Sequence, residues 1–385
     1  MTHRPVVTAI LMLVTSVAPG REWRPPPYLD PPDAMKPPAA DSPRTVDVRI
    51  DPRVELMSII FRLAGNPEYN QGRFTMYLKA IDERFGPHRE HPLFPYVRNL
   101  RATRGVSYDA VMSMAAHLKD PEQLEELIPF DAPGIALDAR WKPDEAREFL
   151  RLARDFAATS DFKGFMAEHS GMHAMIEARM KAMLAEHADF AWFDAFFGGR
   201  PTATFTLIPA PVNGGQNYGP RVVYENGQEE FFAMIGVWQF DADGLPVFDA
   251  RVLPTVIHEF AHSFVNDCVA KHAEALKPAG TVIFPKVEQG MRRQAYGNWR
   301  TMINESLVRA SVIRYILAHD GRPAADRAIA GEMQRSFLWM PGLVELLGEY
   351  EADRAAYPTL DSFMPRVATF FDGVAQRLGQ PTDDR

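Results

Sequence analysis

The sequence is poor in cysteine: Cys268 is the single one among 385 residues. An intramolecular disulfide needs two cysteines, so a disulfide framework is excluded. A chain of this length can bury a large hydrophobic core without such cross-links. We therefore expect a globular protein that is held together by packing.

Runs of basic residues are also missing. The 42 Lys and Arg are outnumbered by 50 Asp and Glu, which gives a formal net charge of −8. This balance argues against nucleic acid or an anionic membrane as the partner. A neutral or peptide-like substrate fits the charge better.

Long apolar runs are limited to the first residues of the chain. Residues 6–17 form an apolar run that is too short for a membrane span. The basic residue Arg4 precedes this run, and the small residues Ser16-Val17-Ala18 end it. This pattern is typical of a signal peptide, which we predict at residues 1–18, with an uncleaved anchor as the alternative. We expect a bacterial protein exported to the periplasm or the medium, with no membrane span in the mature chain.

Proline is abundant just after this segment. Residues 19–45 are dense in proline and indicate an extended linker outside the fold. We expect the remainder, 46–380, to form one continuous domain, although length alone would allow up to three.

The order of predicted elements indicates an α+β fold that is mostly helical. Apolar residues recur at helical spacing in the first half, 46–197, and strand character appears in the second half, 198–380. Helices are predicted at 54–64, 77–85, 107–118, 143–158, 161–186, 289–319, 324–335, 343–356 and 361–378, and strands at 202–208, 221–224 and 230–240. Residues 213–220 and 277–280 are predicted as loops. The strand over 231–240 is expected to be a sheet edge along which a peptide could pair.

One motif dominates the chain, His258-Glu259-Phe-Ala-His262. Residues i and i+4 lie on the same face of a helix, so the two histidines can bind one metal ion together. Glu259 directly follows the first ligand, where it can take a proton from a water held by the metal. The motif is the signature of the zincin metallopeptidases, and the alternative is an ordinary core helix carrying two histidines.

A second histidine pair, His169 and His173, has the same spacing on a predicted helix. No glutamate follows the first histidine, and Gly171 weakens the helix. We interpret this pair as histidines packed beside a core face.

A catalytic zinc needs three protein ligands and an open position. The metzincin pattern would place its glycine and third ligand where Val265 and Cys268 stand, and the aspzincin pattern would need an aspartate at Phe284. Both classes are therefore excluded. Glu305, on a separate predicted helix, is the candidate third ligand, and the alternative is a solvated helix glutamate.

Asn304-Glu305 resembles the Asn-Glu pair that carries the third ligand in gluzincin peptidases. The resemblance implies His258, His262 and Glu305 as ligands of Zn²⁺. Thermolysin-like enzymes have an aspartate four residues after that glutamate, where this chain has Arg309. Arg309 could hold Glu305 or meet a substrate, and support of the histidines then falls to Asp249 or Asp267.

The sequence around the motif, residues 258–266, together with residues 54–60 and 305–310, resembles an uncharacterised bacterial family, domain of unknown function 4932. The resemblance covers roughly residues 45–375. It implies a zincin-like fold and no known substrate.

Hydrolysis of a peptide bond also needs a hydrogen-bond donor for the oxygen that gains negative charge. Three residues are candidates for this donor: Tyr296, Tyr218 and His319. Tyr296 would face away from Glu305 if one unbroken helix carried both, so the choice stays open.

The expected function is that of a zinc metallopeptidase in which Glu259 is the general base and His258, His262 and Glu305 bind the metal. A zinc hydrolase of a non-peptide substrate is one alternative. A zincin-like binding or scaffold protein is the other, although such a protein would not need Glu259. The sequence does not give the substrate preference or the oligomeric state.

Overall fold

The computed structural model describes residues 45–120, 123–200 and 202–379. The predicted signal peptide, 1–18, and the proline-rich linker, except for its last residue, lie outside the described residues. The described part is mostly helical with a small mixed sheet, so the α+β prediction is confirmed. Within the described ranges no helix is both long and apolar enough to cross a membrane.

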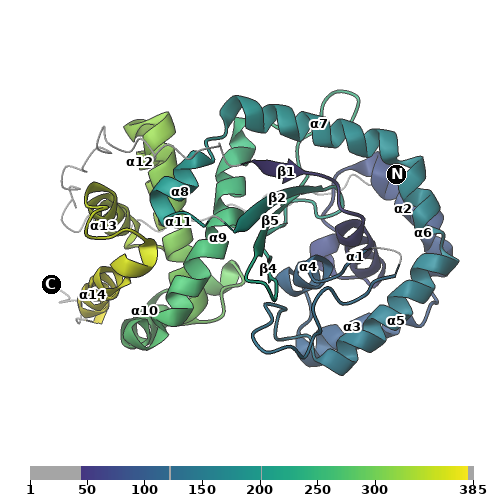
Figure 1. Cartoon of the computed structure of the whole chain (residues 1–385), viewed down its shortest axis with the longest axis horizontal. Helices are drawn as coiled ribbons and strands as arrows, with labels where there is room; N and C mark the ends of the chain where they lie inside the picture. The colour runs from purple at the N-terminus through teal and green to yellow at the C-terminus, as the bar shows by residue number, and fades with distance from the viewer. Residues whose placement is uncertain (1–44, 121–122, 201, 380–385) are drawn as a thin grey trace, which may run out of the picture.

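The sheet has five strands and lies between two groups of helices (Figure 1). Its central strands are parallel: β1 pairs with β2, and β2 pairs with β5 over its whole length. Two short strands, β3 and β4, run antiparallel along the other side of β5. The strands are β1 (Val46–Val48), β2 (Ala203–Ala210), β3 (Asn217–Tyr218), β4 (Arg221–Val223) and β5 (Glu229–Gly236).

Both faces of the sheet are buried, because successive side chains of a strand point to opposite faces. On β5, Phe231, Ala233 and Ile235 belong to one hydrophobic core. Phe232 and Met234, which alternate with them, belong to a second core on the opposite face. The sheet therefore separates an N-terminal core from a C-terminal core.

The N-terminal core is built mainly by the first seven described helices of the chain. The first begins where Pro52 fixes the backbone and the Asp51 carboxylate accepts a hydrogen bond from the backbone N–H of Arg53. The helices are α1 (Pro52–Leu63), α2 (Thr75–Phe85), α3 (Leu93–Arg104), α4 (Asp109–Ala116), α5 (Pro143–Thr159), α6 (Phe162–Glu168) and α7 (Ser170–His187), with short 3₁₀ turns at Pro67–Tyr69 and Gly86–His88.

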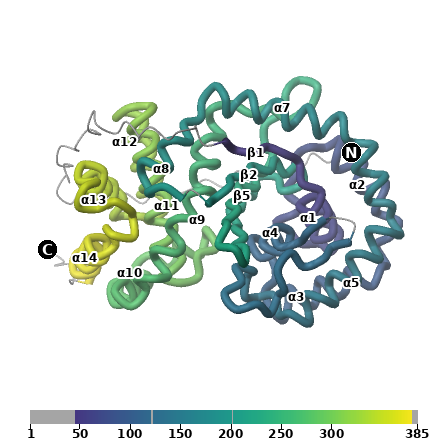
Figure 2. The backbone as a smooth tube through the Cα atoms, viewed as in Figure 1, coloured from purple at the N-terminus to yellow at the C-terminus, as the bar shows by residue number. Residues whose placement is uncertain are grey.

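The C-terminal core holds the helices that carry the predicted site. α9 packs on β5, and α11 packs along α9. In Figures 1 and 2, α7 runs along one edge of the sheet from one helix group toward the other. The helices are α8 (Ala191–Phe197), α9 (Leu253–Lys271), α10 (Ala273–Arg293), α11 (Trp299–Asp320), α12 (Arg322–Gln334), α13 (Met340–Ala352) and α14 (Leu360–Gly379), with a 3₁₀ turn at Ala250–Val252.

Several predicted boundaries are wrong. The helix predicted at 161–186 is broken at His169, and the one predicted at 289–319 is two helices, α10 and α11. Residues 277–280, predicted as a loop, lie inside α10. The predicted loop 213–220 contains the short strand β3.

The predicted sheet edge is also wrong. β5 ends at Gly236 and has neighbours on both sides, β2 on one and β3 and β4 on the other. Among the described residues, β3 and β4 form the edge instead. β4 corresponds to the strand predicted at 221–224, but β3 has only two residues, so alternation in the sequence gives little sign of it.

Candidate metal centre

The two histidines of the motif lie one turn apart on α9. Pro254 stands in the first turn of this helix, where a missing N–H costs nothing. The ring centroids of His258 and His262 are 4.8 Å apart. Their Nε2 atoms approach to 3.2 Å, so both rings direct the same nitrogen toward one point.

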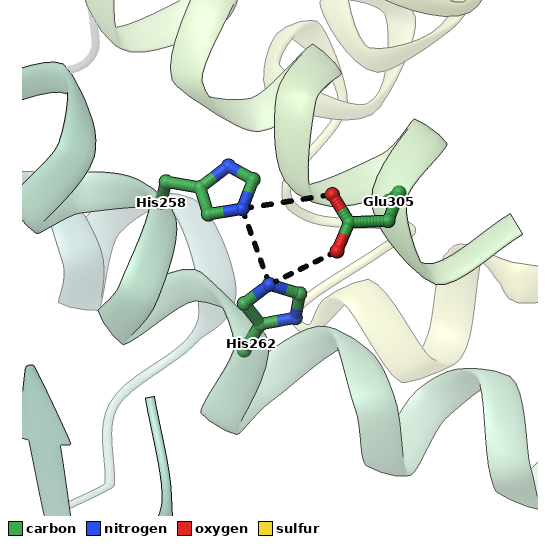
Figure 3. Close-up of side chains that lie close together, drawn as sticks. All are labelled: His258, His262 and Glu305. Atoms are coloured by element: carbon green, nitrogen blue, oxygen red, sulfur yellow. Dashed lines mark hydrogen bonds and ion pairs between the residues drawn. The ribbon is translucent and has the colours of Figure 1, made fainter. Parts of the chain in front are cut away.

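Glu305 reaches the same point from α11. This helix begins at Asn298, whose side-chain oxygen accepts a hydrogen bond from the backbone N–H of Thr301. Glu305 Oε1 lies 3.4 Å from His262 Nε2, and Oε2 lies 3.6 Å from His258 Nε2 (Figure 3). One ligand atom from each of the three residues lies within 4.8 Å of the others.

The donor set has the composition that zinc prefers, two imidazole nitrogens and one carboxylate. Burial lowers the pKa of His258 to about 3, so its ring is neutral and can offer a lone pair. Burial alone would raise the pKa of Glu305, but the two histidines, Arg309 and Tyr296 hold it below its usual value. A neutral ring and an ionised carboxylate are the forms in which these groups bind metal. The residues therefore fit a zinc ion.

Glu259 is buried beside this cluster, with 6% of its surface exposed. Burial and the charge of Glu305 raise its pKa well above the usual value. The sheet edge passes close by: a Cβ on Gly219, which lies between β3 and β4, would stand 2.3 Å from the backbone oxygen of Glu259. The predicted general base thus lies where α9 meets the sheet edge.

Arg309 holds Glu305, which decides between the two roles left open for it. Its Nε donates to Oε2 of Glu305 at 3.2 Å. One terminal nitrogen donates to the Tyr296 hydroxyl at 2.8 Å, and the other donates to both carboxylate oxygens of Glu332 at 2.9 and 3.0 Å. The guanidinium is therefore engaged on every nitrogen by groups of the protein itself.

Tyr296 lies at the site because α11 begins only at Trp299, after a break between the helices α10 and α11. The break includes Ala295, whose φ of 67° turns the backbone. The hydroxyl of Tyr296 donates to Oε2 of Glu305 at 2.9 Å. The expectation that this residue would face away assumed an unbroken helix, which the structure does not have.

The other two candidate donors lie elsewhere. Tyr218 is buried beside Tyr69 in the N-terminal core. His319 bonds Asp189 at 3.1 Å and stacks on Tyr315, near the far end of α11. Neither therefore shares the metal centre with Glu305.

The two aspartates expected to support the histidines are engaged with arginines. Asp249 pairs with Arg251, and Asp267 pairs with Arg221. The partner of His262 is Asn266, whose Oδ1 lies 3.3 Å from the ring Nδ1. Asn266 follows His262 by one helical turn, and this spacing could have identified it.

His169 and His173 contribute to packing in the N-terminal half. His169 Nδ1 bonds the backbone oxygen of Phe165 at 2.8 Å, and His173 Nε2 bonds the Tyr77 hydroxyl at 3.2 Å. Both rings also pack against the ring of Tyr77. In the part of the chain that the structure describes, the α9–α11 cluster is the one group of three or more potential metal ligands.

Comparison with known proteins places the chain in a family. No curated protein and no solved structure matches it. The model of a domain of unknown function, DUF4932, matches residues 46–370. This range includes α9, α11 and the whole sheet, and it covers most of the sequence. The chain therefore belongs to the DUF4932 family.

Proposed function

We propose that this protein is a zinc-dependent hydrolase of the zincin type and that it cleaves peptide bonds. One observation carries the proposal: His258, His262 and Glu305, from two helices far apart in the sequence, direct their ligand atoms to one point. Their side chains are 19%, 16% and 9% exposed, so the point is sheltered but open to solvent. Sheltering strengthens the attraction between a cation and its ligands.

The three ligands would hold the ion, and zinc would supply a Lewis acid that polarises a carbonyl and makes a water easier to deprotonate. The charge of a bound zinc ion would favour the ionised form of Glu259. Its carboxylate would then accept the proton of the attacking water and deliver it to the leaving amine. Of the three candidate donors, Tyr296 is the one whose hydroxyl lies at the site, where it donates to Oε2 of Glu305. It is our choice to stabilise the developing oxyanion, and its hydroxyl would have to turn from Glu305 to the oxyanion to do so.

The sheet edge supports a peptide as the substrate. Within the described ranges, β3 and β4 pair with β5 on one side, and no further strand pairs with them on the other, which is where an extended chain would add to the sheet. The approach of Gly219 to the Glu259 backbone oxygen sets this edge directly beside the catalytic helix. A peptide aligned there would present its main chain next to the general base.

A digest of a mixed peptide library tests this function. The wild-type protein, loaded with zinc, is compared with the Glu259→Gln variant, which keeps all three ligands. We expect cleavage by the wild type and a loss of about 10²- to 10⁴-fold in the variant, because a general base contributes that much. Equal cleavage by both proteins would assign the activity to something else. A zinc-loaded wild type that cleaves no peptide would overturn the peptidase proposal.

A further inference from the structure

The two oxygens of the Glu305 carboxylate have different surroundings. Oε2 accepts hydrogen bonds from the Tyr296 hydroxyl at 2.9 Å and from Arg309 Nε at 3.2 Å. Oε1 faces His262 Nε2 at 3.4 Å (Figure 3). Both oxygens therefore face a histidine, since Oε2 lies 3.6 Å from His258 Nε2, but it is Oε2 that the two donors engage.

Arg309 can keep this asymmetry because it is itself fixed. Glu332 on α12 accepts two hydrogen bonds from one of its terminal nitrogens, and both side chains are 13% exposed. The guanidinium also lies over the Phe337 ring, 5.1 Å from its centroid. A planar group held at three nitrogens and on one face has little freedom to rotate.

Glu332 also lowers the repulsion between Arg309 and a cation bound at the site. A positive guanidinium next to a cation site repels the cation, and the repulsion is strong where water is excluded. The carboxylate of Glu332 offsets part of the charge of Arg309, and Arg335 binds the same carboxylate at 2.9 Å. Arg309 can therefore donate to Glu305 at a smaller cost to metal binding.

We propose that Arg309, held by Glu332, is the positioning residue of this centre and reserves Oε1 of Glu305 for the metal ion. Oε2 is already bound by Tyr296 and Arg309, so Glu305 would hold the ion through Oε1. This role rests on the proposed zinc site. It goes beyond that site by assigning a function to α12, which supplies no ligand.

The test uses the full chain loaded with zinc or with cobalt(II), whose visible absorption reports the coordination number. Arg309→Lys keeps the charge but loses the planar fork, and Glu332→Gln is nearly isosteric and does not touch the ligand. We expect each to weaken zinc binding about 10- to 100-fold, the usual effect of losing a residue that supports a ligand. We also expect both to change the cobalt spectrum. The double variant should lose little more than Arg309→Lys alone, because the two residues act in series.

Arg327→Gln is the matched control, because Arg327 is an exposed arginine on the same helix, α12. Its cobalt spectrum should equal that of the wild type. If the wild type binds zinc and both Arg309→Lys and Glu332→Gln keep its affinity and its spectrum, the positioning role is wrong while the metal site stands. If the wild type binds no zinc, the proposed function itself fails.

Discussion

Gly219 shows how a single residue fixes the distance between the sheet edge and the metal centre. An added Cβ would meet the backbone oxygen of Glu259 at 2.3 Å, and a backbone atom inside α9 cannot rotate away as a side chain can. We predict that Gly219→Ala lowers the free energy of unfolding by about 1–3 kcal/mol, the usual cost of overpacking. Urea unfolding of the variant and the wild type measures this.

Gly215, in the same loop region, provides the control. A Cβ there would have no atom within 4 Å, so Gly215→Ala should change the free energy of unfolding by less than about 0.5 kcal/mol. Similar losses in the two variants would contradict the close approach at Gly219.

The residues of the metal centre differ in how far the sequence predicts them. His258 and His262 form a local pattern, and helical spacing alone puts them together. Glu305 is predicted by the exclusion of other zincin classes and by resemblance, and it lies beside the two histidines in the structure. Helical spacing puts Arg309 beside Glu305, but Glu332, which anchors Arg309, lies on another helix, and no local spacing shows that contact.

Among the elements, α10 shows why proline and glycine are uncertain signs of a loop. Pro278 and Pro285 lie inside this helix, which packs one face into the C-terminal core. Gly280 is a packing residue: a Cβ there would stand 2.6 Å from the Trp299 ring. Burial of the helix face outweighs the hydrogen bonds that proline removes. Sequence pattern alone does not separate a packing glycine from a turn glycine.

A second element-scale feature is a buried polar contact among α1, α2 and α7. The Tyr77 hydroxyl donates to Glu55 Oε2 at 2.9 Å and contacts His173 Nε2 at 3.2 Å. Burial raises the pKa of Glu55 to about 8, despite the opposing hydrogen bond from Tyr77, and the nearby charge of Asp51 adds to the rise. Glu55 therefore carries a proton in the folded protein at neutral pH.

This contact gives a pH dependence with a defined sign. The folded pKa of Glu55 exceeds the unfolded value, so the folded state binds the extra proton between about pH 4.5 and 8. The stability that this proton provides is complete below that range and is lost as the pH rises through it. We predict that the wild type loses stability relative to Glu55→Gln, by at most about 1.4 kcal/mol per pH unit. Urea unfolding at pH 5, 6, 7 and 8 measures the difference.

Glu83→Gln, on the surface of α2, is the control, because the Glu83 side chain is 67% exposed. A constant difference between the wild type and Glu55→Gln across the series would show that Glu55 does not keep its proton in the folded state.

At the scale of the whole molecule, α9 and α11, which carry the proposed metal ligands, belong to one of the two cores that the sheet separates. A ligand that binds only the folded state stabilises it by mass action, by about 2.7 kcal/mol at one hundred times the dissociation constant. We predict that zinc raises the melting temperature of the wild type and that a chelator reverses the rise. Glu305→Ala should show little response. A thermal scan of both proteins with and without zinc checks this, and equal responses would argue against binding at this centre.

The sequence predicts the class of the fold but not how the sheet is assembled. Apolar spacing identifies most helices, and the order of helices and strands indicates α+β. The position of β5 depends on its pairing with β2 and β3, and these contacts are not visible in a local pattern. β1 has three residues and α3 begins among prolines, so neither gives a clear periodic signal.

The most direct test of the central claim is the metal content of the purified protein. Elemental analysis of the wild type and of Glu305→Ala, after dialysis against the same zinc-buffered solution, compares the site with and without its third ligand. We predict about one zinc per wild-type chain, as for a His-His-Glu site, and substantially less in Glu305→Ala. A wild type without stoichiometric zinc, or a variant that retains zinc as tightly as the wild type, would contradict this account.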